Sequence, residues 1–457
     1  MVALFSLQEI FVMIVMKFGG TSLGNAERIK QVAELIKRRD DSFIICSAMS
    51  GVTNSLVDTS GHWKAGNHEG VAEIVAGLKK HFELTCYDLF DNEKATLEAT
   101  SIVSGHFELI TGRMGEDYSI HNENWLLARG EIITSEIIAL YLNSCGIAVT
   151  WLNALDFTLT GSDGEPSVTD MRQRLSAMIG DNPSGRFLTQ GYICIDHEGN
   201  TSNLRRGGSD YTATLAGAAL EAAAIEIWTD IDGVRNNDPR FVEDTFPIRE
   251  LSFDEAAELA YFGAKILHPA CVWPASSDNI PIQLKNTLEP DAPGTMIRSG
   301  TTRKGITAVA AKDGITVIRI RSDRMLNAYG FLSRIFAIFE KNKTPIDVIT
   351  TSEVAVSVTI DDDTCLPAIV PKLEKLGKVE IESAQAIVCV VGDVLEQHTD
   401  RAGRIIDSLR HFNVKMISYG GSRNNITVVV PAEQVKDILR SLNTLLFGTV
   451  LKQVTDG

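Results

Sequence analysis

Basic residues are scarce in this sequence of 457 residues: 43 Lys and Arg face 59 Asp and Glu, a formal net charge of −16. Such an acidic balance argues against a nucleic-acid-binding protein, because binding a phosphate backbone needs a basic face. Long apolar runs are also missing. No stretch approaches about 18 uninterrupted apolar residues, so we expect no transmembrane helix and no membrane partner.

Cysteine is sparse and shows no pairing pattern. The seven cysteines are scattered, several lie inside apolar runs, and none forms a CxxC pair. This spacing argues against a disulfide framework and against a zinc site, so we predict no protein-bound metal. A reducing cytoplasm is the location that this cysteine usage favours.

The first 16 residues are apolar but do not have the features of a signal peptide. They lack a basic segment, include Glu9, and are not followed by a small-residue cleavage site. We predict a buried first strand over residues 12–16. Residues 1–12 are then a dispensable extension whose removal leaves activity intact, and Met13 is an alternative start.

Residues 12–300 alternate apolar, strand-like runs with amphipathic, helix-like ones. One predicted helix carries Ile29, Val32, Ala33 and Ile36 at helical spacing, with Asn25 as its N-cap. Such alternation predicts an α/β domain with a mostly parallel sheet. Residues 60–125 are predicted to be mainly helical, as an accessory cap over one edge. The predicted strands cover residues 12–16, 43–46, 148–152, 187–195, 225–228 and 281–284.

The pattern changes after a boundary at residues 291–304, which are rich in Pro, Gly and Ser. Residues 315–383 read as strand, helix, two strands, helix, strand. Residues 385–454 repeat that order, with a last strand at 450–454. The repeat predicts two ferredoxin-like βαββαβ modules, at residues 310–383 and 384–457. The linear pattern leaves open whether their strands interleave.

Two glycine-rich loops lead into predicted helices. Residues 17–22 read KFGGTS, and residues 205–210 read RRGGSD. Glycines let backbone N–H groups approach an anion, and a helix N-terminus adds a positive dipole end. Neither loop is a Walker A motif. Each alone is also compatible with an ordinary turn or a helix cap, but two in one domain could hold a polyphosphate or two anionic reactants.

Three further motifs are weak one by one. Residues 228–233 read WTDIDG and are followed by DPR at 238–240, after a predicted strand, where α/β sites gather. Residues 262–269 read FGAKILHP, whose His268 is by itself more typical of a packed histidine. Residues 128–131 read ARGE within a helical stretch, where a glutamate is usually solvated.

Together, in this order and spacing, the motifs resemble those of the aspartate kinases. The trailing modules resemble the paired ACT domains of that family. Residues 325–332 (MLNAYGFL) and 347–353 (DVITTSE) are most similar to its monofunctional, lysine-sensitive branch. The resemblance covers the chain from about residue 13 and implies a three-layer amino-acid-kinase domain at residues 12–300. The remaining length leaves no room for the homoserine dehydrogenase of bifunctional relatives.

The resemblance implies ATP-dependent phosphorylation of the L-aspartate side chain to 4-phospho-L-aspartate, with Mg²⁺ held mainly by the ATP phosphates. This is the first step of the aspartate-derived amino-acid pathway. The implied catalytic residues are Lys17, Arg206 and Asp210. The implied aspartate-binding residues are Ser47, Thr53, Glu131 and Arg206. The implied nucleotide-binding residues are Lys17, Gly19, Gly20, Thr229, Asp230, Arg235, Arg240, Lys265 and Ile266.

The resemblance also implies inhibition by an amino-acid end product and a homodimer or higher homo-oligomer. Two carboxylates near the predicted effector site favour a dicationic amino acid, L-lysine, over neutral threonine. The implied effector-binding residues are Met325, Leu332, Asp347, Ser352 and Glu353. Three residues depart from the family pattern, in the second glycine loop, near the nucleotide and in the effector loop: Arg205, Arg235 and Ala328.

Two other interpretations stay open at this point. One is another small-carboxylate kinase of the same superfamily, such as a glutamate or acetylglutamate kinase, against which the ACT-like tail and Glu131 argue. The other is an amino-acid sensor without catalytic activity. Retention of Lys17, Glu131, Arg206 and Asp210 argues against that sensor.

Overall fold

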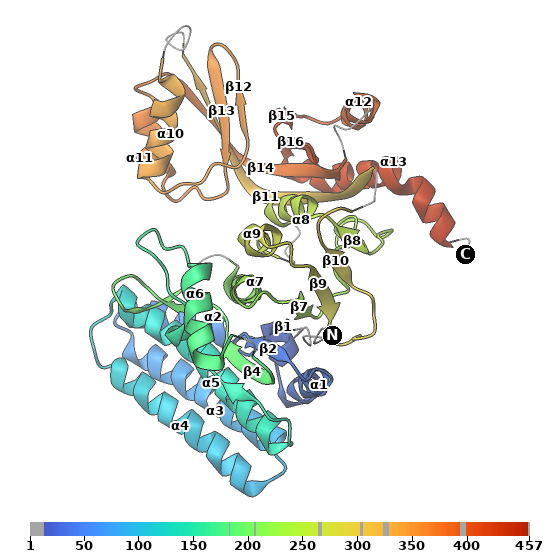
Figure 1. Ribbon diagram of the computed structural model, residues 1–457. Helices are drawn as coiled ribbons and strands as arrows, with labels where there is room; N and C mark the ends of the chain where they lie inside the picture. The colour runs from blue at the N-terminus through green and yellow to red at the C-terminus, as the bar shows by residue number, and fades with distance from the viewer. Residues whose placement is uncertain are drawn as a thin grey trace, which may run out of the picture. The chain divides into compact units, whose positions relative to one another are not determined.

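The structure is a computed structural model that describes residues 13–455 except 182, 205–206, 264–266, 302–304, 323–328 and 394–398. The chain divides into two compact units (Figure 1). Unit 1 comprises Met1–Val234, Arg249–Phe253 and Leu267–Thr301, and unit 2 comprises Arg235–Ile248, Asp254–Ile266 and Thr302–Gly457. Both units are built from noncontiguous pieces, and the predicted domain limits at residues 300, 310 and 384 stay predictions.

Unit 1 is built on an eight-stranded sheet, ordered β3-β4-β2-β1-β7-β9-β10-β8. The sheet is mostly parallel, as predicted, and only β10 runs antiparallel to its neighbour β9. The central strands β1, β2 and β7 are buried almost throughout, which accounts for their near-continuous apolar sequences. The strands are β1 (Ile14–Phe18), β2 (Ser42–Cys46), β3 (Thr150–Trp151), β4 (Arg186–Gln190), β7 (Ala224–Thr229), β8 (Glu250–Leu251), β9 (Ile282–Asn286) and β10 (Thr295–Ile297).

One face of this sheet packs against a thick helical layer. Met16 and Ile44, which point to that face, belong to the same buried cluster as Ile29 and Val32 of α1. The Asn25 side chain accepts a hydrogen bond from the Arg28 N–H, which confirms the predicted cap. The layer continues outward through long helices, so residues 60–125 are mainly helical as predicted. Its helices are α1 (Ala26–Lys37), α2 (Val52–Lys64), α3 (His68–Leu89), α4 (Glu93–Arg113) and α5 (Ile120–Ser144).

The opposite face carries α7 (Gly208–Ala219), which contacts α6 (Val168–Ile179) and α9 (Pro269–Ser277). A Cβ on Gly217 would lie 2.6 Å from Ile225 Cδ1, so α7 lies almost directly on β7. Because strand residues alternate between faces, Lys17 points to the side of α7, whereas its neighbours Met16 and Phe18 point to the side of α1 and α5.

The predicted strand at residues 187–195 is wrong as a single element. It is two strands, β4 and β5 (Ile193–Ile195), and β5 leaves the main sheet to pair with β6 (Thr201–Asn203). Between them, Tyr192 has a φ of 69°, which interrupts the extended backbone. The apolar run does not reveal this break, because residues on both sides of it are buried.

Unit 2 contains a six-stranded antiparallel sheet ordered β12-β13-β11-β14-β16-β15. Two long strands, β11 and β14, pair along their length and each serves both halves of the sheet. The second half of β11 pairs with β13, and the second half of β14 pairs with β16. The strands are β11 (Ile306–Arg321), β12 (Ile349–Thr351), β13 (Ala355–Ile360), β14 (Lys378–Gly392), β15 (Met416–Tyr419) and β16 (Asn425–Pro431).

The predicted last strand at residues 450–454 is also wrong, because these residues lie in α13 (Val435–Thr455). Buried Val435, Ile438, Leu439 and Leu442 follow a helical spacing that sets the start of α13. Residues 306–312 of β11 pair with β14 instead. The other helices of unit 2 are α8 (Phe253–Tyr261, whose first residue lies in unit 1), α10 (Phe331–Lys341), α11 (Leu366–Leu373) and α12 (Thr399–Ser408).

Among the described residues, no helix combines the length and apolar character needed to cross a membrane. The same part of the chain contains no group of three or more His, Cys, Asp or Glu side chains that could hold a metal ion.

Candidate active site

The candidate site of unit 1 lies where three adjacent parallel strands end. Lys17 is in β1 and is followed by Gly19 and the short 3-10 helix η1 (Gly20–Leu23). Hydrogen bonds join the ends of the strands: Gly19 N–H donates to Trp228 O at 3.1 Å, and Ser47 N–H donates to Phe18 O at 3.1 Å. The carboxyl ends of β1, β2 and β7 therefore form one edge, on which loops from distant parts of the sequence meet.

Close packing explains why position 20, in the first glycine-rich loop, is a glycine. A Cβ on Gly20 would lie 2.7 Å from the carbonyl oxygen of Ala48. A side chain at this position would push the loop after β1 away from the loop after β2. Gly20 thus brings the backbone that follows Lys17 against the loop that carries Ser47.

The second glycine loop brings an acid to Lys17. Gly207 and Gly208 both have positive φ, 69° and 49°, and lead directly into α7. This turn places Asp210 in the first helical turn, where its carboxylate lies 2.7 Å from the Lys17 ammonium. Both side chains are largely buried, at 11% and 18% exposure. Burial weakens solvent screening, so this pair holds the ammonium in a defined place.

A serine that sequence analysis did not single out, Ser209, adds a second contact between the loop after β2 and α7. The Ser47 hydroxyl donates to the Ser209 hydroxyl at 2.9 Å, which joins the loop after β2 to the first turn of α7. Ser209 lies inside the RRGGSD motif, next to Asp210. The motif was the available signal, but a small polar residue in a glycine loop looks like an ordinary turn residue.

Glu131 on α5 is buried in the structure, with 4% of the residue exposed. Burial raises the pKa of this carboxyl to about 8, while the Lys17 charge and a backbone hydrogen bond from Ala48 act in the opposite direction. Its Oε2 atom is buried and accepts no hydrogen bond within the described residues. A buried acid with an unused oxygen near a cation can receive a further donor, such as an ammonium group.

The other predicted residues of unit 1 that the structure describes lie on the same edge of the sheet. Thr53 is half-buried in the first turn of α2, just after Gly51, whose φ is 83°. Thr229 ends β7, and its hydroxyl donates to Asp230 at 3.3 Å. Asp230 is exposed. The structure therefore brings together the predicted residues after β1, β2 and β7 with those on α5 and α7.

Two predicted nucleotide-binding arginines belong to unit 2. Arg235 donates from Nε to the Thr245 hydroxyl at 2.8 Å and from Nη2 to the Thr245 carbonyl at 2.7 Å. Arg240 forms an ion pair with Asp238 at 2.6 Å and is 69% exposed. Arg235 thus closes its own loop, whereas Arg240 presents a guanidinium to solvent.

Several predicted residues lie outside the described part of the chain. These are Arg206, Lys265 and Ile266 of the active site and Met325 of the effector site, together with the departures Arg205 and Ala328. Their roles stay predictions.

The predicted effector residues that the structure describes differ in exposure. Leu332 is 37% exposed, and Ser352 and Glu353 are exposed in the turn between β12 and β13. The Asp347 side chain is only 2% exposed, and its Oδ1 lies 3.0 Å from the Lys312 ammonium. Tyr261 donates to the same oxygen at 2.7 Å, while Oδ2 is buried without a partner among the described residues. An effector ammonium would have to compete with Lys312 for this carboxylate.

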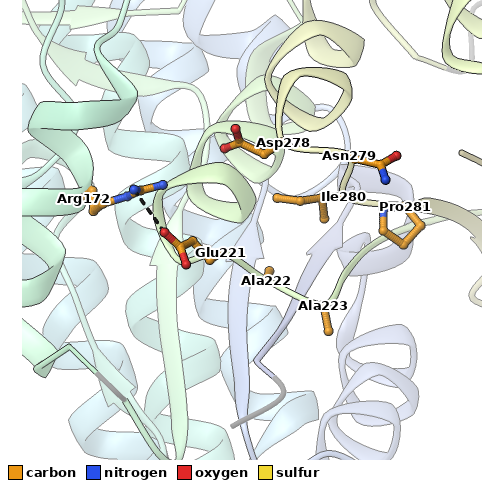
Figure 2. Close-up of a pocket in the computed structure, with 8 residues that line it drawn as sticks. All are labelled: Arg172, Glu221, Ala222, Ala223, Asp278, Asn279, Ile280 and Pro281. Atoms are coloured by element: carbon orange, nitrogen blue, oxygen red, sulfur yellow. Dashed lines mark ion pairs between the residues drawn. The ribbon is translucent and has the colours of Figure 1, made fainter. Parts of the chain in front are cut away.

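A cavity of about 430 Å³ lies at the other edge of the sheet, near the amino ends of β7 and β9 (Figure 2). Arg172 and Glu221 form an ion pair of 3.1 Å at one side of it. Arg172 also donates to the carbonyl oxygens of Ala218 and Ala219, which caps the C-terminus of α7. None of the predicted site residues lines this cavity.

Comparison with known proteins agrees with this geometry. Residues 12–286 match the amino acid kinase family, and residues 388–446 match an ACT domain. Aspartokinase 3, chloroplastic, of Arabidopsis thaliana is 32% identical, over 95% of this chain and 82% of its own length. Lysine-sensitive aspartokinase 3 of Escherichia coli K12 is 30% identical, over 95% of this chain and 99% of its own length.

A crystal structure of E. coli aspartokinase III in complex with aspartate and ADP (R-state) matches 95% of this chain and all of its own, with a TM-score of 0.84 and 29% identity. The same enzyme in complex with lysine and aspartate (T-state) matches with a TM-score of 0.75 at 29% identity. An amino acid kinase domain combined with ACT domains defines the class. Within that class, this chain belongs to the aspartokinases.

Proposed function

We propose that this chain transfers the γ-phosphoryl group of ATP to the side-chain carboxylate of L-aspartate, giving 4-phospho-L-aspartate and ADP. The meeting of Lys17, Asp210 and Glu131 at one edge of the sheet carries the proposal. Membership of the aspartokinases makes the chain a phosphotransferase with a carboxyl group as acceptor. The relative crystallised with aspartate and ADP supports aspartate as the substrate and an adenine nucleotide as the second ligand.

The chemistry needs charge neutralisation more than proton transfer. A side-chain carboxylate with a solution pKa of about 3.9 is already ionised at neutral pH, so the nucleophile requires no general base. The difficulty is to bring this anion to an anionic phosphate, and that is a task of positioning and electrostatics. Lys17 is held at this edge by Asp210 and is the cation that we assign to the transferring phosphate.

The glycine loops complete the phosphate site in this proposal. Gly19 and Gly20 offer backbone N–H groups after β1, and the first turn of α7 offers a positive dipole end. We assign nucleotide contacts to Thr229, Asp230, Arg235, Arg240, Lys265 and Ile266. Mg²⁺ would be held mainly by the phosphate oxygens of ATP and would supply further neutralisation of the phosphoryl charge.

Aspartate binding is assigned to groups of complementary charge. Glu131 receives the substrate ammonium on its unused buried oxygen, and Arg206 pairs with the α-carboxylate. A guanidinium suits a bidentate contact with a carboxylate. Ser47 and Thr53 offer hydroxyl groups, and Asp210 orients both Lys17 and the substrate ammonium.

We further propose that L-lysine inhibits the enzyme through the ACT region, with Met325, Leu332, Asp347, Ser352 and Glu353 as its contacts. E. coli aspartokinase III has been crystallised with lysine, and this relative is called lysine-sensitive, which supports the assignment. Inhibition requires lysine to favour a less active state. A homodimer is the working unit that we propose.

An ADP-release assay tests the catalytic proposal. Wild-type protein is given ATP and Mg²⁺ with L-aspartate, L-glutamate, N-acetyl-L-glutamate or no acceptor. We expect ADP release that depends on aspartate, and acyl phosphate trapped by hydroxylamine. Equal rates with glutamate would point to another carboxylate kinase, and no acceptor-dependent release at all would point to a sensor without catalysis.

The regulatory proposal is tested by calorimetry with lysine, threonine and methionine, beside activity assays, on wild type and Glu353→Ala. We expect lysine to bind and inhibit, and the exposed Glu353 carboxylate to contribute to its affinity. Lysine that neither binds nor inhibits would refute the effector assignment. Inhibition undiminished by Glu353→Ala would remove only Glu353 from the site.

A further inference from the structure

Two side chains of α5 hold consecutive peptide groups of the loop after β2. Glu131 and Thr134 are three residues apart, so they lie on the same face of the helix. The Ala48 backbone forms a hydrogen bond with the Glu131 carboxyl, and the Met49 N–H donates to the Thr134 hydroxyl at 3.2 Å. Thr134 is not among the predicted site residues, although it holds the same loop as Glu131.

The Thr134 hydroxyl can meet this loop only as a hydrogen-bond acceptor. It donates to the Gly130 carbonyl at 2.7 Å, one turn back along α5. A hydroxyl carries a single proton, so the bond from the Met49 N–H uses a lone pair of the oxygen. Donation to a carbonyl also polarises the hydroxyl and strengthens it as an acceptor. The turn of α5 that carries Glu131 therefore presents a fixed acceptor to the loop.

This contact is shielded from solvent. Thr134 is 1% exposed and Met49 is 2% exposed. A Cβ on Gly130 would lie 3.3 Å from the Ala48 Cβ, so α5 and the loop are already in close contact. A buried N–H that loses its acceptor is costly, because water cannot take the place of the lost partner. Removing the hydroxyl should therefore shift the Met49 peptide group.

The Met49 peptide group is connected to both hydroxyl residues that we assign to aspartate. Ser47 lies two residues before it. The Met49 carbonyl accepts a hydrogen bond from the Val52 N–H at 3.1 Å. Val52 begins α2, and Thr53 is the next residue in its first turn. A shift at Met49 would therefore move Ser47 and Thr53 relative to Glu131.

We infer that Thr134 is a positioning residue for the amino-acid substrate, whose hydroxyl fixes the loop after β2 at a set place relative to Glu131. The inference rests on the proposed function, in which Glu131 receives the substrate ammonium and the loop supplies hydroxyl groups. Affinity for aspartate then depends on the separation between the two, which the Thr134 contact sets. The nucleotide residues follow β1 and β7 and do not depend on this contact.

Steady-state kinetics on two variants test the inference. Thr134→Val keeps the branched shape but replaces the hydroxyl with a methyl group, whereas Thr134→Ser keeps the hydroxyl. For Thr134→Val, we expect the aspartate KM to rise about tenfold, with kcat and the KM for ATP changed about twofold at most. Such a split between KM and kcat indicates lost substrate binding, which a general loss of structure does not produce. Thr134→Ser should keep an aspartate KM close to that of the wild type.

Thr85→Val is the matched control. Thr85 is also a buried threonine within a helix, and its hydroxyl donates to the His81 carbonyl at 2.9 Å. Its helix, α3, carries none of the predicted site residues. The substitution removes the same chemical group from a buried helical site, and it should leave kcat and both KM values unchanged.

Three results would overturn the inference: an unaltered aspartate KM in folded Thr134→Val, an equal rise in the KM values for aspartate and ATP, or an aspartate KM raised as much in Thr134→Ser. If Thr134→Val does not fold, Thr134→Ala removes the same hydroxyl and carries the same expectation. Wild-type protein without aspartate-dependent ADP release would instead refute the proposed function.

Discussion

At the scale of single residues, the contact between Lys17 and Asp210 sets the position of the reacting charge. The two charged groups lie 2.7 Å apart and are largely buried, so water cannot easily take the place of either partner in the ion pair. Lys17→Met removes the cation, and Asp210→Asn keeps the shape but removes the partner charge. Since the proposed catalysis is electrostatic, we expect kcat to fall about 10²–10³-fold or more in each. Steady-state rates, with circular dichroism to verify folding, measure this. A folded variant with near-wild-type kcat would contradict the assigned chemistry.

Glu131 predicts a pH dependence of aspartate binding. Burial raises its pKa to about 8, so below this pH the free enzyme holds the carboxyl mostly protonated. The substrate ammonium pairs with the ionised form, so binding at pH 7 should release a proton. We therefore expect the aspartate KM to fall about tenfold per pH unit as pH rises from 6 towards 8, with the KM for ATP nearly constant. Calorimetry in buffers of different ionisation enthalpy should detect the proton, and an aspartate KM independent of pH in this range would contradict it.

The same pKa shift predicts a change in stability. The folded protein binds the Glu131 proton more tightly than the unfolded chain does, so stability falls as pH rises from the ordinary glutamate pKa of 4.5 through about 8. Glu131→Gln removes this penalty, which is on the order of 5 kcal/mol at its fullest. The variant should gain in Tm relative to wild type at pH 9 and gain little at pH 5. A gain of equal size at both pH values would show that ionisation is not the cause.

Sequence alone could predict that these loops meet, for a physical reason. Loops that follow parallel strands meet at one edge, so KFGGTS, the Ser47 loop and WTDIDG could be expected together. The burial of Glu131 could not be predicted, because the pattern of α5 does not reveal which of its faces α2 covers. The break in the predicted strand at Tyr192 was missed because it depends on the hydrogen bonds of Tyr192 with Leu204 and Thr212, and of Gly191 with Cys46. These partners are set by the fold and are not visible in the local sequence pattern.

At the scale of elements, the approach of α5 to α2 positions Glu131. A Cβ on Gly130 would lie 2.9 Å from Val52 Cγ1 and 3.1 Å from Leu56 Cδ1. Gly130→Ala should therefore separate the two helices, cost about 1–3 kcal/mol, and raise the aspartate KM by displacing the neighbouring carboxylate. Denaturant unfolding and kinetics measure both effects.

Gly105→Ala provides the control for that helix pair. Gly105 lies in α4 and is exposed, and an alanine Cβ at this position would meet no atom within 4 Å. Replacing it should stabilise the protein by about 0.5–1 kcal/mol through helix propensity and leave the KM unchanged. If Gly130→Ala behaved like Gly105→Ala, close helix packing would not be what positions Glu131.

Elements whose apolar residues all lie on the buried face were predicted well. The central strands and α1 are buried on the faces that their apolar residues indicate. The two failures have one cause, since both depend on pairing partners that the local pattern does not show. Residues 193–195 leave the main sheet because β6 pairs with them, and residues 450–454 remain helical because β11 already occupies the strand position beside β14.

At the scale of the whole molecule, unit 2 includes residues 235–248, which lie within the part of the sequence that matches the amino acid kinase family. Val242 is buried in a cluster with Val309, Val428 and Phe447, and Phe246 packs against that cluster. Polar contacts add to it: Asn236 donates to Asn443 at 3.1 Å, and Asn237 donates to the Leu439 carbonyl at 3.2 Å. The ACT-containing region thus supplies the core for a kinase segment.

This arrangement predicts that a chain ending at residue 301 will not behave as an independent kinase. Without β11, β16 and α13, the apolar side chains of Val242 and Phe246 lose their cover, and exposed apolar surface promotes aggregation. We expect the shortened chain to be poorly soluble, and co-expression of residues 305–457 to restore solubility and ATP-dependent activity. The matched test is the shortened chain with both Val242→Ser and Phe246→Ser. This double substitution should restore solubility, but it should not restore the native position of the loop that carries Arg235 and Arg240. A shortened chain that is soluble, cooperatively folded and as active as the full chain would refute the dependence.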